Sequence, residues 1–280
     1  MVILFIADIM GKPGRYAVAT LLTPLKKKYT VDFVIANVEN AAGGFGVTKE
    51  IAHKIFHYGV DCQTNGNHVW DRRELLEFIG QTPNMLRPAN FPPGTPGSGS
   101  GLFTTKAGVN IGVINLQGRI FMAQLDCPFR AADKEIEKLK SETNIIIVDF
   151  HAEATSEKQA LGWYLDGRVS AVLGTHTHVQ TADETILPNG TAYITDAGMT
   201  GPHHSVIGIN KEDALERFVK QLPRRFTIAE KDVKLCAILL EIDEKSGEAK
   251  KIERLRIDVP KAQTDEVREE AYLSEEEEDR

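Results

Sequence analysis

The sequence predicts a layered α/β fold, and two observations lead to this prediction. Between residues 1 and 180, short apolar runs alternate with amphipathic stretches, which is the pattern of β-strand and α-helix units packed around a sheet. Hydrophobic residues make up 42% and charged residues 26% of the 280 residues, as in an average soluble globular protein with a sizeable core. No apolar run approaches the roughly 18 to 20 residues that a membrane span requires, so we expect no membrane partner.

The apolar runs predict β-strands, because they are rich in Val and Ile and too short for helices. In chain order, the predicted strands cover residues 2–7, 33–38, 61–64, 145–150 and 171–173. The stretches between them have helical spacing, as Thr48, Ile51 and Ile55 illustrate. The predicted helices cover residues 15–28, 48–58, 72–80, 131–140 and 156–164. Residues 85–101 are rich in proline and glycine and predict an irregular connection.

The later segments predict antiparallel hairpins. Residues 102–105 and 110–115 flank Ala107-Gly108, which is typical of a turn between two strands. In the C-terminal third, the predicted strands cover residues 224–229, 233–242 and 249–257. No G-x-G-x-x-G motif follows the first strand and no Walker A loop is present, so neither a Rossmann dinucleotide site nor a phosphate loop is supported.

The net charge of −7 lies entirely at the C-terminal end. Residues 265–280 contain nine acidic and two basic residues, so residues 1–264 are formally neutral. A neutral body has no excess of basic residues to release counterions from a long nucleic acid, and this release drives tight binding. We therefore expect one domain over residues 1–260, a disordered acidic tail over 261–280 and no long nucleic-acid partner. The three cysteines form no C-x-x-C pair, which favours a reducing cytoplasm over a disulfide framework.

Five of the apolar runs end in residues that commonly bind metals. One such ending is usually a helix cap or a turn residue, but five of them together favour a binding site. Ligands gather at the carboxyl ends of strands in α/β sheets, so these endings are expected to converge. In chain order, the endings are Asp8, Glu39-Asn40, Asn67-His68, His151 and His176-Thr177-His178.

The side chains at these endings indicate which metals would bind. In an extended strand, His176 and His178 would point to the same face, because side chains alternate with a period of two. The set combines imidazole, carboxylate and amide groups and contains no cysteine. Such a set suits iron, manganese or zinc better than calcium or magnesium.

Taken together, these motifs resemble those of the calcineurin-like metallophosphoesterases, and in particular the YmdB-type bacterial branch of cyclic-nucleotide phosphodiesterases. The segments VENAAGGFG (38–46), DFHAEATSEK (149–158) and GTHTHVQTAD (174–183) extend the similarity over about residues 1–258. The signature residues are Asp8, Glu39, Gly66-Asn67-His68, His151 and the run Gly174-Thr175-His176-Thr177-His178.

Three positions depart from the general superfamily pattern. Met10 stands where most members have the second residue of D-x-H, and Glu39 replaces a bridging aspartate. A thioether is a poor ligand for a hard divalent ion, so Met10 is not expected to bind metal and Asn40 fills its place. Thr175 is inserted between the glycine and the first histidine of G-H-x-H. The first two departures are features of the YmdB-type branch.

The resemblance implies a four-layer α/β/β/α sandwich of the metallophosphoesterase type with mixed sheets, formed by residues 1–260. It also implies a centre of two divalent or trivalent metal ions, with iron expected and manganese or zinc as alternatives. Glu39 would bridge the two ions, and His68 would act as the catalytic acid. The first ion would be held by Asp8, Glu39, Asn40 and His178. The second would be held by Glu39, Asn67, His151 and His176.

The implied activity is hydrolysis of 2',3'-cyclic nucleotides to the 3'-phosphate in the cytoplasm, with 3',5'-cyclic nucleotides as further substrates. Three alternatives remain open at this stage. Another phosphoesterase or a nuclease could use the same metal centre, and a mononuclear zinc hydrolase could act on an amide or ester. A regulatory protein could instead use the fold only for binding. The oligomeric state is also open, including a homo-oligomer.

Overall fold

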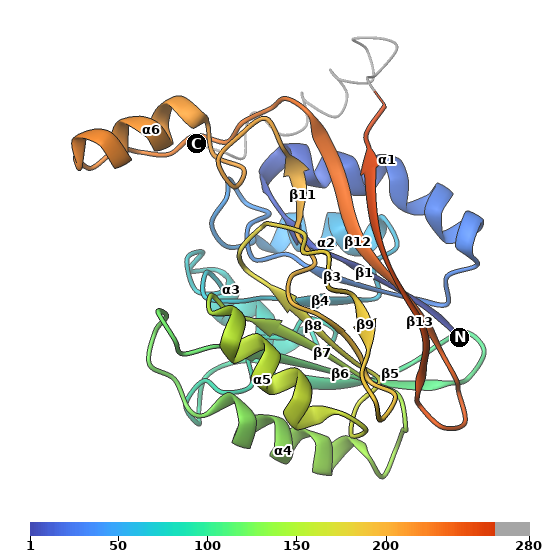
Figure 1. Ribbon diagram of the computed structural model, residues 1–280. Helices are drawn as coiled ribbons and strands as arrows, with labels where there is room; N and C mark the ends of the chain where they lie inside the picture. The colour runs from blue at the N-terminus through green and yellow to red at the C-terminus, as the bar shows by residue number, and fades with distance from the viewer. Residues whose placement is uncertain (261–280) are drawn as a thin grey trace.

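The computed structural model describes residues 1–260, and the predicted acidic tail over 261–280 lies outside the described residues. Two mixed β-sheets pack face to face, and helices cover their outer faces (Figure 1). The predicted four-layer α/β/β/α sandwich is therefore confirmed. Within residues 1–260, no helix is long and apolar enough to cross a membrane.

The first sheet has seven strands and is built around β1, which pairs parallel with β3 and antiparallel with β12. In spatial order, the strands are β2 (Asp8–Ile9), β11 (Met199–Pro202), β12 (Val233–Ile242), β1 (Val2–Ile6), β3 (Phe33–Asn37) and β4 (Cys62–Thr64), with β13 (Ala249–Asp258) also paired with β12. The helices α1 (Gly11–Tyr29) and α2 (Lys49–His57) pack on its outer face (Figure 1).

The second sheet has six strands, and its centre is the parallel set β6, β7, β8 and β10. In spatial order, the strands are β5 (Ser100–Thr104), β6 (Asn110–Gln117), β7 (Ile146–His151), β8 (Ala171–Thr175), β10 (Ala192–Ile194) and β9 (Thr185–Ile186). The helices α4 (Pro128–Leu139) and α5 (Thr155–Leu165) cover the face that points away from the first sheet (Figure 1).

The strand β1 shows how the sequence separates the layers. Its alternate residues Ile3 and Phe5 pack into the core between the two sheets, whereas Leu4 and Ile6 pack into the core under α1 and α2. All four side chains are fully buried. A strand that is apolar on both faces therefore has to lie inside a layered fold, and its carboxyl end is held rigidly.

Parts of the predicted secondary structure are wrong. Residues 224–229 form no strand; the only pairing in this segment is an isolated bridge between Ile209 and Ile228. Contacts between side chains hold the segment instead, since Thr227 and Arg224 both bond to Asp213. That aspartate belongs to the unpredicted helix α6 (Lys211–Lys220). Where a helix was predicted over 72–80, the structure has only the short helix α3 (Leu75–Phe78) and a 3-10 turn (Ile79–Gln81). The strands β9, β10 and β11 were not predicted, because they are only two to four residues long.

Candidate metal centre

The structure brings the predicted site residues together at one edge of the sandwich. The first sheet supplies the oxygen donors, because Asp8, Glu39, Asn40 and Asn67 follow the ends of β1, β3 and β4. The second sheet supplies the nitrogen donors, because His151 ends β7 and the other two histidines follow β8. The eight predicted site residues found at this edge are Asp8, Glu39, Asn40, Asn67, His68, His151, His176 and His178.

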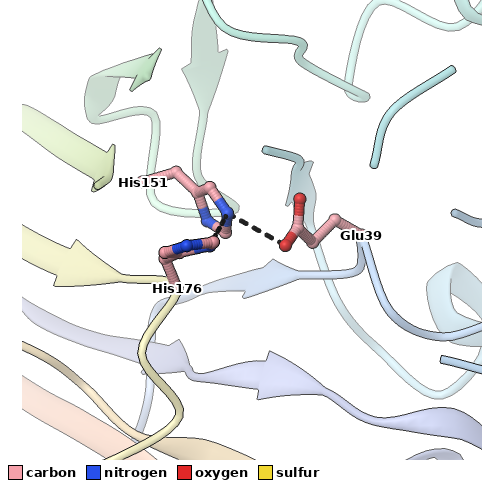
Figure 2. A group of neighbouring side chains, drawn as sticks. All are labelled: Glu39, His151 and His176. Atoms are coloured by element: carbon pink, nitrogen blue, oxygen red, sulfur yellow. Dashed lines mark hydrogen bonds and ion pairs between the residues drawn. The ribbon is translucent and has the colours of Figure 1, made fainter. Parts of the chain in front are cut away.

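Four electron-pair donor atoms converge around His151. Its Nε2 atom lies 2.9 Å from Glu39 Oε1, 3.0 Å from Asn67 Oδ1 and 2.9 Å from His176 Nδ1. Figure 2 shows the side chains of Glu39, His151 and His176 pointing toward one another. Lone pairs facing each other at this distance repel unless a proton or a cation lies between them. This donor set therefore fits a divalent metal ion.

The other half of the cluster contains Asp8, Asn40 and His178. Asp8 Oδ2 accepts a hydrogen bond from the His176 backbone N–H at 2.8 Å and lies 3.6 Å from His178 Nε2. Among the described residues, the buried Oδ1 atom of Asp8 has no hydrogen-bond partner. Buried carboxylate oxygens normally have a partner, so this oxygen fits a site for a cation. Asn40 Nδ2 lies 3.1 Å from His178 Nε2, and a half-turn of the amide would present Oδ1 there instead.

The electrostatics of the metal-free cluster show which atoms are ready to bind a cation. Burial alone raises the pKa of Glu39, but the neighbouring His151 outweighs it and lowers that pKa to about 2. Burial alone lowers the pKa of His151, but Glu39 outweighs it and raises that pKa to about 9. Burial and the charge of His151 together lower the pKa of His176 to about 3, and burial also lowers the pKa of His178. Both of these imidazoles are thus neutral at pH 7 and keep a lone pair.

Burial raises the pKa of Asp8 well above its usual value, and the nearby Glu39 carboxylate adds to this effect. The positive charge of His151 acts in the opposite direction. A metal ion would remove this conflict, because a cation stabilises two neighbouring carboxylates at once. The electrostatics therefore point to the same conclusion as the unpaired Asp8 oxygen.

A buried relay fixes the orientation of His151. Its Nδ1 atom lies 3.0 Å from Thr175 Oγ1, and that hydroxyl donates to Asp149 Oδ1 at 2.7 Å. Asp149 also accepts hydrogen bonds from Asn37 at 3.1 Å and from Thr64 at 2.5 Å. Because the Thr175 proton goes to Asp149, Nδ1 of His151 must donate, which leaves Nε2 facing the cluster. The inserted Thr175 thus has a structural role that its position in the motif did not reveal.

The expectation that His176 and His178 continue an extended strand is wrong. The strand β8 ends at Thr175, and both histidines adopt left-handed backbone conformations, with φ of 99° and 64°. Asp196 stabilises this turn, because its Oδ2 atom accepts from the Thr177 N–H at 3.0 Å and from the Thr177 hydroxyl at 2.8 Å. The buried Lys158 donates to the same oxygen at 2.6 Å.

Each of these two histidines is also oriented through its second nitrogen. His176 Nε2 lies 3.0 Å from Glu153 Oε2, so its Nδ1 atom faces the cluster. His178 Nδ1 donates to the Ile207 carbonyl at 2.9 Å, so its Nε2 atom faces Asp8 and Asn40. A hydrogen bond at the outer nitrogen selects the tautomer whose lone pair can bind a metal. Sequence reasoning did not identify Glu153, since nothing in its spacing distinguishes it from other exposed acids.

His68 lies beside the cluster without being part of its donor set. Its backbone N–H donates to Glu39 Oε2 at 3.1 Å, and its Nδ1 atom lies 2.7 Å from Asp71 Oδ2. Within residues 1–260, its Nε2 atom has no hydrogen-bond partner. Its ring also meets the Phe45 ring edge to face, with 5.1 Å between the centroids. An imidazole held by a carboxylate on one nitrogen can release a proton from the other.

Gly66 has no side chain, and this lets His151 and Glu39 lie close to its backbone. A Cβ atom at Gly66 would lie 2.2 Å from His151 Cδ2 and 2.3 Å from Glu39 Oε2. Any other residue here would displace two members of the cluster. Met10, which was not expected to bind metal, instead packs with Met199 and Ile209 in a small apolar cluster.

A two-sheet α/β sandwich with oxygen donors from one sheet and imidazoles from the other defines a protein of the metallophosphoesterase type. The family model of YmdB-like proteins matches residues 4–255, and the chain belongs to this family. The family predicted from the sequence motifs is thereby confirmed.

Known proteins that are similar in sequence and structure agree with this family assignment. The 2',3'-cyclic-nucleotide 2'-phosphodiesterase of Bacillus subtilis (strain 168) is 52% identical over 257 residues, which cover 92% of this chain and 97% of the relative. A hypothetical protein from Thermus thermophilus has a crystal structure that superposes with a TM-score of 0.87 at 43% identity, covering 93% of this chain and all of that one. A phosphatase from Mycoplasma pneumoniae gives a TM-score of 0.87 at 35% identity over 92% of this chain and 93% of its own.

Proposed function

We propose that this protein hydrolyses 2',3'-cyclic nucleotides to nucleoside 3'-phosphates at a centre of two metal ions, and that 3',5'-cyclic nucleotides are secondary substrates. The observation that carries the proposal is the set of four donor atoms formed by His151 Nε2 and the three atoms around it, next to the unpaired buried oxygen of Asp8. The 52% identity to a phosphodiesterase of this specificity supports the choice of substrate.

The proposed ligand sets follow the two halves of the cluster. Bound metal ions would activate the attacking water and offset the negative charge that develops on the phosphate. Glu39 is the residue common to both sets, because its Oε1 atom lies 2.9 Å from His151 Nε2 and 3.3 Å from Asn40 Nδ2. Iron is the expected metal, with manganese or zinc as alternatives that the nitrogen and oxygen donors also fit. The first set is Asp8, Glu39, Asn40 and His178, and the second is Glu39, Asn67, His151 and His176.

We assign His68 as the catalytic acid. Hydrolysis forms a new bond between water oxygen and phosphorus while the bond from phosphorus to O2' breaks, and the departing oxygen needs a proton. Asp71 holds Nδ1 of His68 at 2.7 Å, so the proton for the leaving group comes from Nε2. The backbone bond from His68 to Glu39 keeps this imidazole beside the metal ligands.

The test uses protein purified without added metal. Iron, manganese and zinc are quantified per chain, and the same sample is assayed on 2',3'-cyclic AMP, 3',5'-cyclic AMP, a cyclic dinucleotide, RNA and 5'-AMP. We expect close to two metal ions per chain and the highest kcat/KM on 2',3'-cyclic AMP. A preference for 5'-AMP or RNA would replace the proposal with a phosphomonoesterase or a nuclease, and binding without turnover on every substrate would indicate a regulatory protein.

A further inference from the structure

Phe45 lies in the loop that follows the metal-ligand pair Glu39-Asn40, and it remains 39% exposed. Within residues 1–260, it belongs to none of the hydrophobic core clusters. A large aromatic side chain stabilises a fold mainly by leaving water, so an exposed one contributes little of this stabilisation. Packing of the core therefore does not account for a phenylalanine at this position.

The loop around Phe45 is held in one conformation. The Arg72 guanidinium donates through Nε to the Phe45 carbonyl at 3.1 Å and through Nη2 to the Ala42 carbonyl at 2.7 Å. The two neighbours of Phe45 in the chain, Gly44 and Gly46, have φ of 90° and 73°, which side chains with a Cβ rarely allow. An aromatic ring on a loop that is already fixed loses little freedom when a ligand binds, and this favours a binding role.

The Phe45 ring contacts the proposed catalytic acid. Its centroid lies 5.1 Å from that of the His68 ring, and the two planes meet at 80°. Asp71 occupies Nδ1 of His68 at 2.7 Å, so Nε2 of the same ring supplies the proton for the leaving oxygen. Any group bonded close to that oxygen is therefore brought near Phe45.

The chemistry of a 2',3'-cyclic nucleotide identifies this group as the base. Only the bonds O2'–C2', C2'–C1' and C1'–N separate the leaving oxygen O2' from the base, whereas O3' is one bond further away. When His68 protonates O2', the base therefore lies next to the His68 ring and within reach of Phe45. An aromatic ring offers a flat apolar face on which any nucleobase can stack.

We propose that Phe45 is the stacking platform for the nucleobase, and that it makes the site prefer nucleotides to cyclic phosphates without a base. The inference rests on the proposed function, because it takes O2' as the leaving oxygen and His68 as its acid. Stacking tolerates every base, so purine and pyrimidine 2',3'-cyclic nucleotides should all be substrates, with the larger purines preferred.

Kinetics of the full-length, metal-loaded protein test the proposal with two substrates that expel the same oxygen. One is 2',3'-cyclic AMP, and the other is methyl β-D-ribofuranoside 2,3-cyclic phosphate, which lacks the base. Phe45→Ala should lower kcat/KM about tenfold more on the first substrate than on the second, mainly through KM, and Phe45→Tyr should restore the wild-type ratio. The matched control is Leu102→Ala on β5, because Leu102 is equally exposed (40%) and pairs with Gly112 near the start of β6, away from the site. This control should leave the ratio unchanged.

A purely structural role of Phe45 predicts a different pattern. If the ring only supported His68, Phe45→Ala would slow both substrates equally and would shift the pH profile of kcat for both. That result would overturn the proposal, as would a Phe45→Ala protein with the wild-type KM for 2',3'-cyclic AMP.

Calorimetric titration of the same proteins with the product 3'-AMP separates this inference from the proposed function. Phe45→Ala should raise the Kd of 3'-AMP about tenfold, and Phe45→Tyr should not. A wild type that binds 3'-AMP through Phe45 but does not hydrolyse 2',3'-cyclic AMP would refute the proposed activity and leave the platform in place. Normal hydrolysis with equal Kd values for wild type and Phe45→Ala would refute the platform alone.

Discussion

Replacing Glu39 by Gln is the most informative perturbation, because it keeps the side-chain volume and removes one negative charge. Two divalent ions about 4 Å apart repel by roughly 17 kcal/mol at an effective dielectric constant of about 20. Only two of the seven proposed ligands, Asp8 and Glu39, carry charge that can offset this repulsion. The substitution halves that charge, so at least one ion should bind at least 100-fold more weakly and turnover should fall in proportion.

The same substitution has a calculable effect on the metal-free protein. The pKa of Glu39 falls from 4.5 to about 2 beside His151, which corresponds to a stabilisation on the order of 3 kcal/mol. The pKa of His151 rises from 6.5 to about 9, but this shift reports the same ion pair and is not added. For a chain of this size, losing this stabilisation in Glu39→Gln lowers the melting temperature of the metal-free protein by roughly 6 to 12 °C.

The pH dependence has a definite sign. The Glu39 contribution is present above pH 4.5 and is lost as the pH falls toward 2, whereas the His151 contribution is present below pH 6.5 and is lost as the pH rises through 9. Glu39→Gln should therefore destabilise the chelated protein most between pH 4.5 and 6.5, and much less above pH 9.

The assay measures metal per chain, hydrolysis of 2',3'-cyclic AMP and thermal unfolding of chelated protein at pH 6 and pH 9.5. Glu135→Gln is the matched control, because Glu135 is a buried acid remote from the cluster that pairs with Lys138 and accepts a hydrogen bond from Ser100. The control should lose some stability but keep its metals. A Glu39→Gln protein with two metals and near-normal turnover would refute the assignment of Glu39 to both ions.

Three further predictions concern residues around this centre. His68→Ala should keep the metal content and lose at least 100-fold in turnover of 2',3'-cyclic AMP, but much less on bis(p-nitrophenyl) phosphate, whose leaving group needs no proton; equal losses would exclude the acid role. Thr175→Val should weaken metal binding roughly tenfold in competition with a chelator and Thr175→Ser should restore it, because the hydroxyl relays Asp149 to His151; similar affinities for both variants would argue against the relay. Deleting residues 265–280 should change neither metal content nor turnover, and a fall in either would mean that the tail contacts the body.

The predictions from the sequence succeeded where local pattern and tertiary structure agree. The runs that became β1, β3 and β7 are apolar on both faces, so only a buried strand could accommodate them. The strand β12 was predicted with its observed bounds, because its run is bordered by polar turn residues. Polar residues at the ends of several such strands indicated the site, since parallel strands bring their carboxyl ends to one edge.

The sequence could not reveal features that depend on contacts between distant segments. The helix α6 has no apolar face toward the body, so its pattern did not place it in a layer. The conformation of His176 and His178 depends on Asp196 and on the Ile207 carbonyl, which lie about 20 to 30 residues further along the chain. Asp149 looked like an ordinary strand residue until the fold placed two threonines against it.

The division of donor atoms between the sheets has a consequence for assembly. All oxygen donors precede residue 70, and all nitrogen donors follow residue 150. During synthesis the first half-site therefore emerges long before its counterpart, and neither can enclose a cation alone. A bound ion would link the two sheets, because it would be held by residues from both. Removing the ion with a chelator should therefore speed amide exchange at the carboxyl ends of β1 and β8 more than at the edge of the sandwich opposite the site. Metal loading would then be a late maturation step, coupled to docking of the two sheets.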